Sequence, residues 1–132
     1  MNDSVSGRPA FGRRTILIAD DEPGMRCFIR DALSGNDYEF IEAVDGRSAQ
    51  HIVEERRIDL IITDICMPDR DGLEAIQAIR RIQARSKILA VSGAFDGLFL
   101  AAARAFGADA ALSKPFRSSE LSDCVNQLMC AA

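Results

Sequence analysis

TILIADDE, residues 15–22, joins a short, mostly apolar run directly to three consecutive acids. Four further apolar runs of similar length follow along the chain, at residues 38–43, 59–63, 87–92 and 109–113. Continuous apolar runs of this length are typical of parallel strands that are covered on both faces. The second run alternates in part, as a strand at the edge of a sheet does. The sequence therefore predicts five strands, the first of which ends in acidic residues.

Segments of helical length separate these runs, and each carries residues that start or stop helices. Pro23 suits the first turn of a helix that stops at Gly35, and residues 46–57 form a second helix. The other helices are predicted from their ends, which are Asp71 before the third, Asp96 and Gly107 around the fourth, and Ser118 or Ser119 before the fifth. Strands that alternate with helices predict an α/β domain, a (βα)5 doubly wound parallel sheet.

Composition is that of an ordinary one-domain globular protein. The 132 residues are 48% hydrophobic and 27% charged, which argues against disorder. The net charge of −4 argues against direct binding of nucleic acid. No stretch approaches the ~18 apolar residues of a membrane span. Residues 1–14 lack the apolar run of a signal peptide and are interpreted as a flexible tail before a domain at 15–130. We therefore expect a cytoplasmic protein without membrane insertion.

Cysteine and histidine usage argues against several kinds of site. Cys27, Cys66, Cys124 and Cys130 form no CxxC pair and lack the spacing of zinc ligands. His51, the only histidine, lies in a predicted amphipathic helix with no nucleophile nearby in sequence. A disulfide framework, a zinc site and nucleophilic catalysis of the Ser-His-Asp or Cys-His type are therefore not expected.

Polar residues gather where the predicted strands end. They are Asp20, Asp21 and Glu22 after the first strand, Asp64 after the third, Ser92 at the end of the fourth, and Lys114 with Pro115 after the fifth. In a flavodoxin-like sheet of order 2-1-3-4-5, the first and third strands are neighbours, so their acids converge at the carboxyl edge. Ligands of open α/β sheets bind at this point.

Crowded carboxylates favour a bound divalent cation, because like charges repel one another unless a cation neutralises them. Mg²⁺ is the natural candidate, since it prefers oxygen ligands and keeps several waters. A carboxylate beside it can act as a nucleophile and form an acyl phosphate. Lys114 would bring positive charge to the phosphoryl oxygens, and Ser92 a hydroxyl donor. Each residue alone has a plainer structural explanation; their joint placement favours a phosphoryl-accepting site.

Five stretches, in this order and spacing, point to one known family. They are ILIADDEPGMR (16–26), EAVDG (42–46), DLIITDICMPDRDG (59–72), ILAVSGA (88–94) and FGADAALSKPF (106–116). Together with the final helix, they resemble the receiver domain of two-component response regulators, of the stand-alone, single-domain type. The resemblance implies a phospho-acceptor that is not a conventional enzyme, although self-catalysed phosphorylation and autodephosphorylation are expected. The phosphoryl donor would be a sensor histidine kinase or a phosphotransfer domain, with acetyl phosphate as a small substitute.

The resemblance assigns roles to the acids. Asp64 would be the phospho-acceptor and also a ligand of the Mg²⁺ ion. Asp21 would be a direct Mg²⁺ ligand, and Asp20 would act largely through water. The backbone carbonyl of Cys66 would be a further protein ligand.

The resemblance also implies how the phosphoryl group is contacted. Ser92 would swing toward it and Lys114 would bind it, with a cis Lys114–Pro115 peptide bond. One departure from the family concerns the switch aromatic that usually lies three residues before the lysine. Ala111 occupies that position, so the usual coupling between a hydroxyl residue and an aromatic ring is not expected here.

The predicted fourth helix is unusually rich in apolar residues. Phe95, Leu98, Phe99, Leu100 and Phe106 exceed what one buried stripe needs. Two explanations stay open at this stage. The residues fill the space that the absent aromatic leaves, or they form an exposed patch that docks a partner or a second copy in a dimer.

Two functions from different classes follow from the sequence. The first is phosphoryl-acceptor signalling through protein–protein contacts. The alternative is a phosphorylation-independent adaptor of the same fold, for which the missing aromatic would be a sign of decay. A nucleotide enzyme is disfavoured, since neither GxxxxGK[ST] nor GxGxxG is present. The kinase, the downstream target, and the choice between a chemotaxis-like and a relay role stay open.

Overall fold

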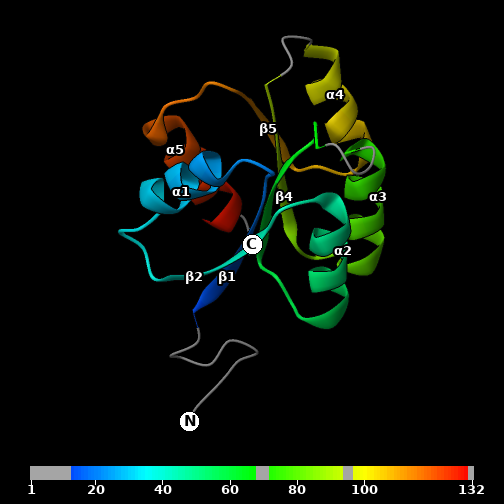
Figure 1. The fold of residues 1–132 in the computed structure, drawn as a ribbon, viewed down its shortest axis with the longest axis horizontal. Helices are drawn as coiled ribbons and strands as arrows, with labels where there is room; N and C mark the ends of the chain where they lie inside the picture. Colours follow the sequence, from blue (N-terminus) through cyan, green and yellow to red (C-terminus); the bar gives the residue numbers. More distant parts are fainter. Residues whose placement is uncertain (1–12, 68–71, 94–96, 131–132) are drawn as a thin grey trace.

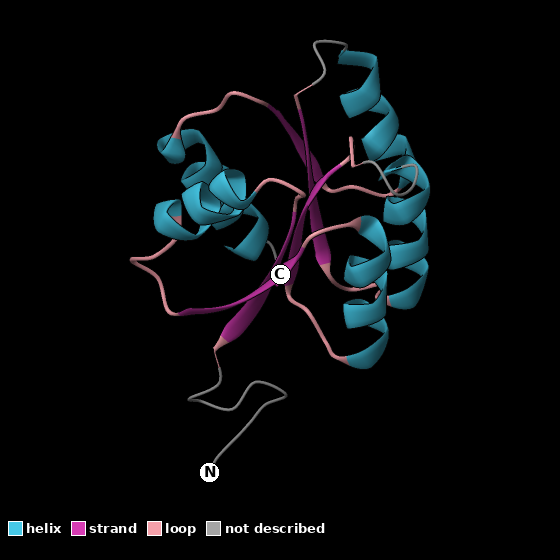
Figure 2. Ribbon diagram, viewed as in Figure 1, coloured by secondary structure: helices cyan, strands magenta, loops and turns pink. Residues whose placement is uncertain are grey.

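Strands and helices alternate strictly through the part of the chain that the structure, a computed structural model, describes: residues 13–67, 72–93 and 97–130 (Figures 1 and 2). The strands are β1 (Arg14–Ala19), β2 (Tyr38–Ala43), β3 (Leu60–Asp64), β4 (Lys87–Ser92) and β5 (Ala110–Ser113). The helices are α1 (Pro23–Ala32), α2 (Gly46–Glu55), α3 (Gly72–Ile82), α4 (Gly97–Phe106) and α5 (Ser118–Cys130).

The strands form one parallel sheet of order β2-β1-β3-β4-β5, which confirms the predicted fold class. In Figure 1, α1 and α5 cover one face of the sheet, and α2, α3 and α4 cover the other. The register aligns Ala19 with Thr63 and Asp64 with Val91. The central strands therefore finish at one common edge, and the residues that follow them are brought together.

The hydrophobic core has two halves because successive strand residues point to opposite faces. Leu17 and Ile61 pack on the side of α2, α3 and α4. Ile16 and Ile62 pack on the side of α1 and α5. All four side chains are excluded from solvent. This burial on both faces explains why the central strands are continuous apolar runs rather than alternating ones.

Element bounds agree with the predicted ones to within two residues, except that α1 ends at Ala32, three residues before the predicted stop at Gly35. β2 and β4 match, while β3 begins and ends one residue later, so that Asp64 is its last residue. α2 ends at Glu55, two residues early. α5 begins at Ser118, so both serines lie inside the helix and the predicted serine cap is wrong. The predicted caps Asp71 and Asp96 lie outside the described residues.

Two large apolar side chains of α1 and α3 are partly exposed. Phe28 of α1 is 37% exposed, and its ring lies against that of Phe116 with centroids 5.9 Å apart. Ile82 is 39% exposed because it is the last residue of α3, beyond the buried Ile79. Helical spacing predicts the direction in which a side chain points from the helix axis. It does not predict whether that side chain is buried, because the end of a helix can extend past the sheet.

Two glycines have a structural requirement. Gly107 follows α4 with a φ of 127°, in the region that glycine tolerates, which confirms the predicted helix stop. Gly72 begins α3 so close to the end of β3 that a Cβ there would lie 2.2 Å from the carbonyl oxygen of Ile65.

Over the described residues, no helix has the length and apolar character needed to span a bilayer.

Candidate phosphoryl-acceptor site

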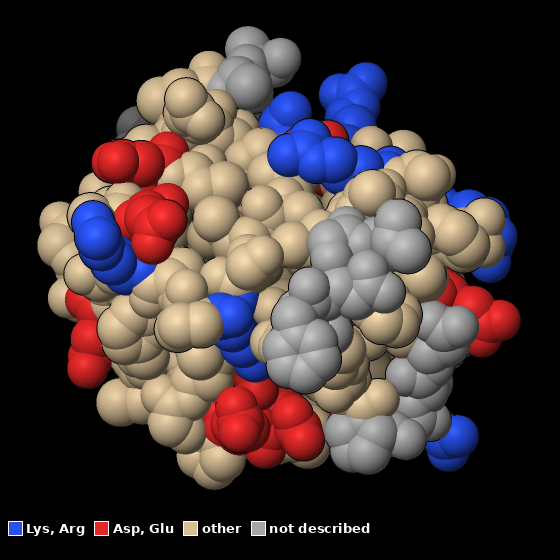
Figure 3. Space-filling model, turned by 90° about the horizontal axis from the view of Figure 1, so that it is seen from above, with Lys and Arg blue, Asp and Glu red and all other residues tan. Residues whose placement is uncertain are grey.

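The acids that follow β1 and end β3 meet, as the predicted strand order requires. Asp20, Asp21 and Asp64 each offer a carboxylate oxygen, and these atoms lie within 4.8 Å of one another. Asp20 and Asp64 are 1% and 5% exposed, whereas Asp21 faces solvent. Figure 3 views the end of the molecule where the strands finish and shows acidic side chains gathered there beside a basic one.

Lys114 reaches this cluster from the end of β5. Its Nζ lies 2.9 Å from Oδ2 of Asp20 and 2.7 Å from Oδ2 of Asp64. Its backbone N–H donates to the carbonyl of Ser92, which fixes the end of β5 beside β4. The Lys114–Pro115 peptide bond is cis, as the family resemblance implies. One ammonium thus bridges two buried carboxylates.

The electrostatics of Lys114 follow from these contacts. Burial by itself lowers the pKa of its ammonium, but the hydrogen bonds to Asp20 and Asp64 and the charges of these two carboxylates together outweigh burial and hold the pKa above its usual value. Three carboxylates and one ammonium leave the cluster with two uncompensated negative charges. An ion of charge +2 with a preference for oxygen ligands fits this donor set.

Backbone donors fix the other oxygen of each buried carboxylate. Oδ1 of Asp20 accepts from the N–H of Glu22 at 2.9 Å, and Oδ1 of Asp64 accepts from the N–H of Cys66 at 2.8 Å. In both cases the donor lies two residues further along the chain. The carboxylates are therefore held in one orientation before any ligand arrives.

Cys66 and Ser92 lie side by side at this edge. The exposed Cys66 side chain has its Sγ 3.4 Å from Oγ of Ser92, which is fully buried. Cys66 therefore belongs to the site by position, next to the carboxylate that its N–H contacts. Ser92 ends β4, beside the β3 strand that Asp64 ends.

Sequence reasoning missed Arg26. Its Nη1 donates to the backbone carbonyl of Asp20 at 2.7 Å, and its Nε pairs with Glu42 at 2.7 Å. Arg26 thus ties α1 and β2 to the acidic loop. The available signal was an arginine one turn into the helix that follows the acids. Glu22, included with those acids, precedes α1 and makes no side-chain cap there.

The apolar residues of α4 differ in burial, and the two explanations for them stay open. Phe106 packs against the core, whereas Phe99 is 43% exposed. Phe95 and the side chain of Leu98 lie outside the described residues. Ala111 sits half-buried in β5, in register with Ala90 of β4.

Comparison with known proteins defines the family. Residues 16–126 match the response regulator receiver domain. The chain is 33% identical over 115 residues to chemotaxis protein CheY of Bacillus subtilis, covering 86% of this chain and 96% of that protein. It is 26% identical over 114 residues to sporulation initiation phosphotransferase F of the same organism, covering 86% and 92%. The solved structure of chemotaxis response regulator CheY4 of Vibrio cholerae has a TM-score of 0.80 at 28% identity, covering 88% and 98%.

The chain therefore belongs to the response regulator receiver family. Members of this family are phospho-acceptor signalling domains of two-component systems rather than conventional enzymes. They interact with histidine kinases or phosphotransfer proteins.

Proposed function

We propose that this chain is a single-domain response regulator that accepts a phosphoryl group on Asp64. The observation that carries the proposal is the meeting of Asp20, Asp21 and Asp64 within 4.8 Å, with Lys114 bonded to two of them. The donor is a sensor histidine kinase or a phosphotransfer protein of the cytoplasm. Likeness to CheY along 96% of that protein supports the single-domain form.

The metal in this proposal is Mg²⁺. Asp21, Asp64 and the backbone carbonyl of Cys66 would hold it, with Asp20 acting largely through water. All of these donors are hard oxygen atoms, and the cluster's charge matches a divalent ion. When bound, the ion neutralises phosphoryl oxygens as they approach the carboxylates.

In this proposal, phosphoryl transfer to Asp64 is a displacement reaction at phosphorus. An oxygen of Asp64 attacks the phosphorus of a phosphohistidine, an O–P bond forms and the N–P bond breaks. The electron pair returns to the imidazole nitrogen. Lys114 then pairs with the new phosphoryl oxygens and Ser92 donates a hydrogen bond to them. Water later attacks the phosphorus of the acyl phosphate, the O–P bond to Asp64 breaks, and inorganic phosphate and the free carboxylate are formed.

The direct test is phosphorylation by acetyl phosphate with Mg²⁺, followed by intact mass. The wild-type chain should gain one acid-labile phosphoryl group, and Asp64→Asn should gain none. Asp123→Asn, which changes an exposed carboxylate of α5, is the matched control and should behave as wild type. Phosphorylation of Asp64→Asn to the wild-type level would reject the assignment of Asp64.

A phosphorylation-independent adaptor is the second candidate, and Ala111 in place of an aromatic favours it. Titration with Mg²⁺ separates the two candidates. Binding that Asp21→Ala abolishes supports the phospho-acceptor, whereas no binding by the wild-type chain supports the adaptor.

The predicted dimer through the fourth helix is part of the same proposal. The exposed Phe99 of α4 supports it. Sizing the protein with and without Mg²⁺ and beryllofluoride tests it: a dimer that appears only with the phosphoryl mimic, and that Phe99→Ser abolishes, is the expected result. A monomer under both conditions would leave signalling to contacts with other proteins.

A further inference from the structure

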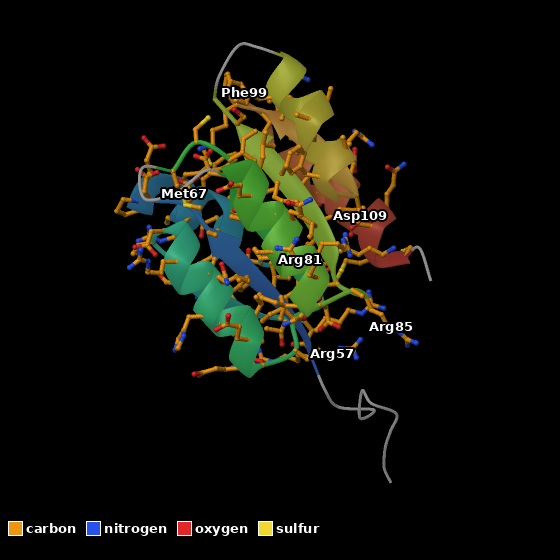
Figure 4. The ribbon with its side chains drawn as sticks, turned by 90° about the vertical axis from the view of Figure 1, so that its right-hand side faces the viewer. Arg57, Met67, Arg81, Arg85, Phe99 and Asp109 are labelled. Atoms are coloured by element: carbon orange, nitrogen blue, oxygen red, sulfur yellow. The ribbon has the colours of Figure 1, made fainter. Side chains whose placement is uncertain are left out.

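Two adjoining hollows lie at the end of the molecule opposite the acidic cluster, where the strands begin. One, of about 430 Å³, lies between the end of α2 and the turn from α3 to β4. The other, of about 410 Å³, continues from that turn toward Asp109, just before β5. Arg57 and Arg85 line both hollows and lie near one another in Figure 4, far from Met67 and Phe99.

We call this surface the basic groove. Its cationic side chains are Arg56, Arg57, Arg80, Arg85 and Lys87, and its carboxylates are Glu54, Glu55 and Asp109. The excess of cations is local, because the whole chain carries a net charge of −4.

Neighbouring carboxylates neutralise only part of this positive charge. Arg56 pairs with Glu39 at 3.2 Å, and Arg80 pairs with Asp109 at 2.6 Å. By contrast, Arg57, Arg85 and Lys87 form no ion pair with any residue in the described part of the chain. Both of these arginines are exposed. Three cations are therefore available to an anionic ligand.

The frame that carries these cations is rigid. The side-chain amide of Gln83 donates to the carbonyls of Val53 and Arg56 at 2.8 and 2.6 Å and accepts from the N–H of Ile58 at 2.9 Å. Arg80 donates to the carbonyl of Ser86 at 2.7 Å. These bonds fix the turn after α2 to the turn after α3. These two turns are therefore ordered before a ligand binds. A ligand of the groove would lose little affinity to the entropy cost of ordering them.

We propose that the basic groove binds an acidic segment of a partner protein. Guanidinium groups such as those of Arg57 and Arg85 match carboxylates in geometry and charge. Two hollows in succession suit an extended chain whose carboxylates are spaced along it. The groove and the acidic cluster lie at opposite ends of the strands, so both can be occupied together.

The test is a titration of the ¹⁵N-labelled chain with a hexaglutamate peptide, followed by two-dimensional NMR. Backbone signals of residues 54–58 and 83–88 should shift, and the shifts should weaken with added salt. The double variant Arg57→Glu/Arg85→Glu should lose affinity by about tenfold or more, because two attractive contacts become repulsive. Arg81→Glu is the matched control, since Arg81 is an exposed arginine of α3 that lines neither hollow (Figure 4). It should bind as wild type.

Three results would overturn the proposal. They are no shift in the groove signals, an equal loss of affinity in Arg81→Glu, or tighter binding at the groove by an oligothymidylate of equal charge. Dispersed NMR signals and normal phosphorylation by acetyl phosphate show whether the double variant is folded. Because the titration uses no phosphoryl donor and no Mg²⁺, its outcome is independent of the role proposed for Asp64.

Discussion

A single ammonium decides the charge balance of the acceptor site. Lys114 donates to the same two carboxylates that a divalent ion would approach, so lysine and metal compete for oxygen atoms. Without a metal, this ammonium is the counterion that contacts both buried carboxylates. In the proposed function, a bound metal would free this ammonium to contact a phosphoryl group. In the proposed function, Lys114 is therefore a structural counterion before phosphorylation and a phosphate-binding residue after it.

Lys114→Met should separate these two roles. The variant leaves buried carboxylates without a counterion, so without Mg²⁺ its free energy of unfolding should fall by about 3 kcal/mol. Its affinity for Mg²⁺ should rise, because the competing ammonium is gone and the cluster is more negative. Urea unfolding and Mg²⁺ titration measure the two effects. Lys87→Met, which removes the only other lysine, should change neither. Weaker Mg²⁺ binding by Lys114→Met would contradict the competition.

Single residues also show where sequence reasoning reaches its limit. Asp20 and Asp64 were predictable as neighbours because their strands are adjacent in the predicted sheet, and Lys114 was predictable at the same edge because it follows a strand. Arg26 was not, because its contact with the site goes to a backbone carbonyl, which no side-chain pattern marks. Phe99 and Phe106 are seven residues apart and share one helical stripe, yet they differ in burial. Position along the helix axis decides this, and periodicity carries no information about it.

At the scale of elements, strands were easier to predict than helix ends. Buried parallel strands require continuous apolar runs, and these runs gave the bounds of β2 and β4 without error. The end of α2 was placed two residues late because Arg56 and Arg57 continue a helix-compatible sequence. What stops that helix is Gln83, from a distant turn, which binds the carbonyls of Val53 and Arg56. A tertiary contact of this kind has no local signal.

The side chain of Glu42 links β2 to α1 through ion pairs. Arg26 and Arg30 both donate to its carboxylate, at 2.7 and 2.6 Å, and lower the pKa of Glu42. A carboxylate with a lowered pKa in the folded state contributes stability above its ordinary pKa of 4.5, and that contribution is lost as the pH falls through the lower folded value. The junction should therefore weaken in acid.

Glu42→Gln tests this pH dependence. Near neutral pH the variant should be less stable than wild type by roughly 0.5–1 kcal/mol, as expected for a partly exposed ion pair. The difference should shrink from neutral to strongly acidic pH, because the wild-type carboxyl becomes protonated as the pH falls through the lowered folded pKa of Glu42. Chemical unfolding at the two pH values gives the comparison, with the exposed Glu74→Gln as the control. A difference that persists unchanged in acid would mean that the ion pairs do not cause it.

At the scale of the whole molecule, the acidic site and the fold are energetically linked. A ligand that binds only the folded state stabilises it, by about 2.7 kcal/mol when its free concentration is a hundred times Kd. Mg²⁺ should therefore raise the melting temperature of the wild-type chain. Asp21→Asn, which removes one exposed carboxylate of the proposed metal site, should abolish most of the rise without lowering the melting temperature in metal-free buffer. Differential scanning calorimetry measures both. An equal rise in the variant would place the bound ion elsewhere.

The contact between Gly72 and the carbonyl of Ile65 has a genetic consequence. Even one methyl group at position 72 must displace the backbone of the residue directly after Asp64. A screen for mutants that no longer transmit their signal should thus recover alanine at this codon alongside changes at codon 64, although it alters no charge and touches no phosphate. Alanine at position 72 would thus abolish signalling by displacing the backbone of Ile65.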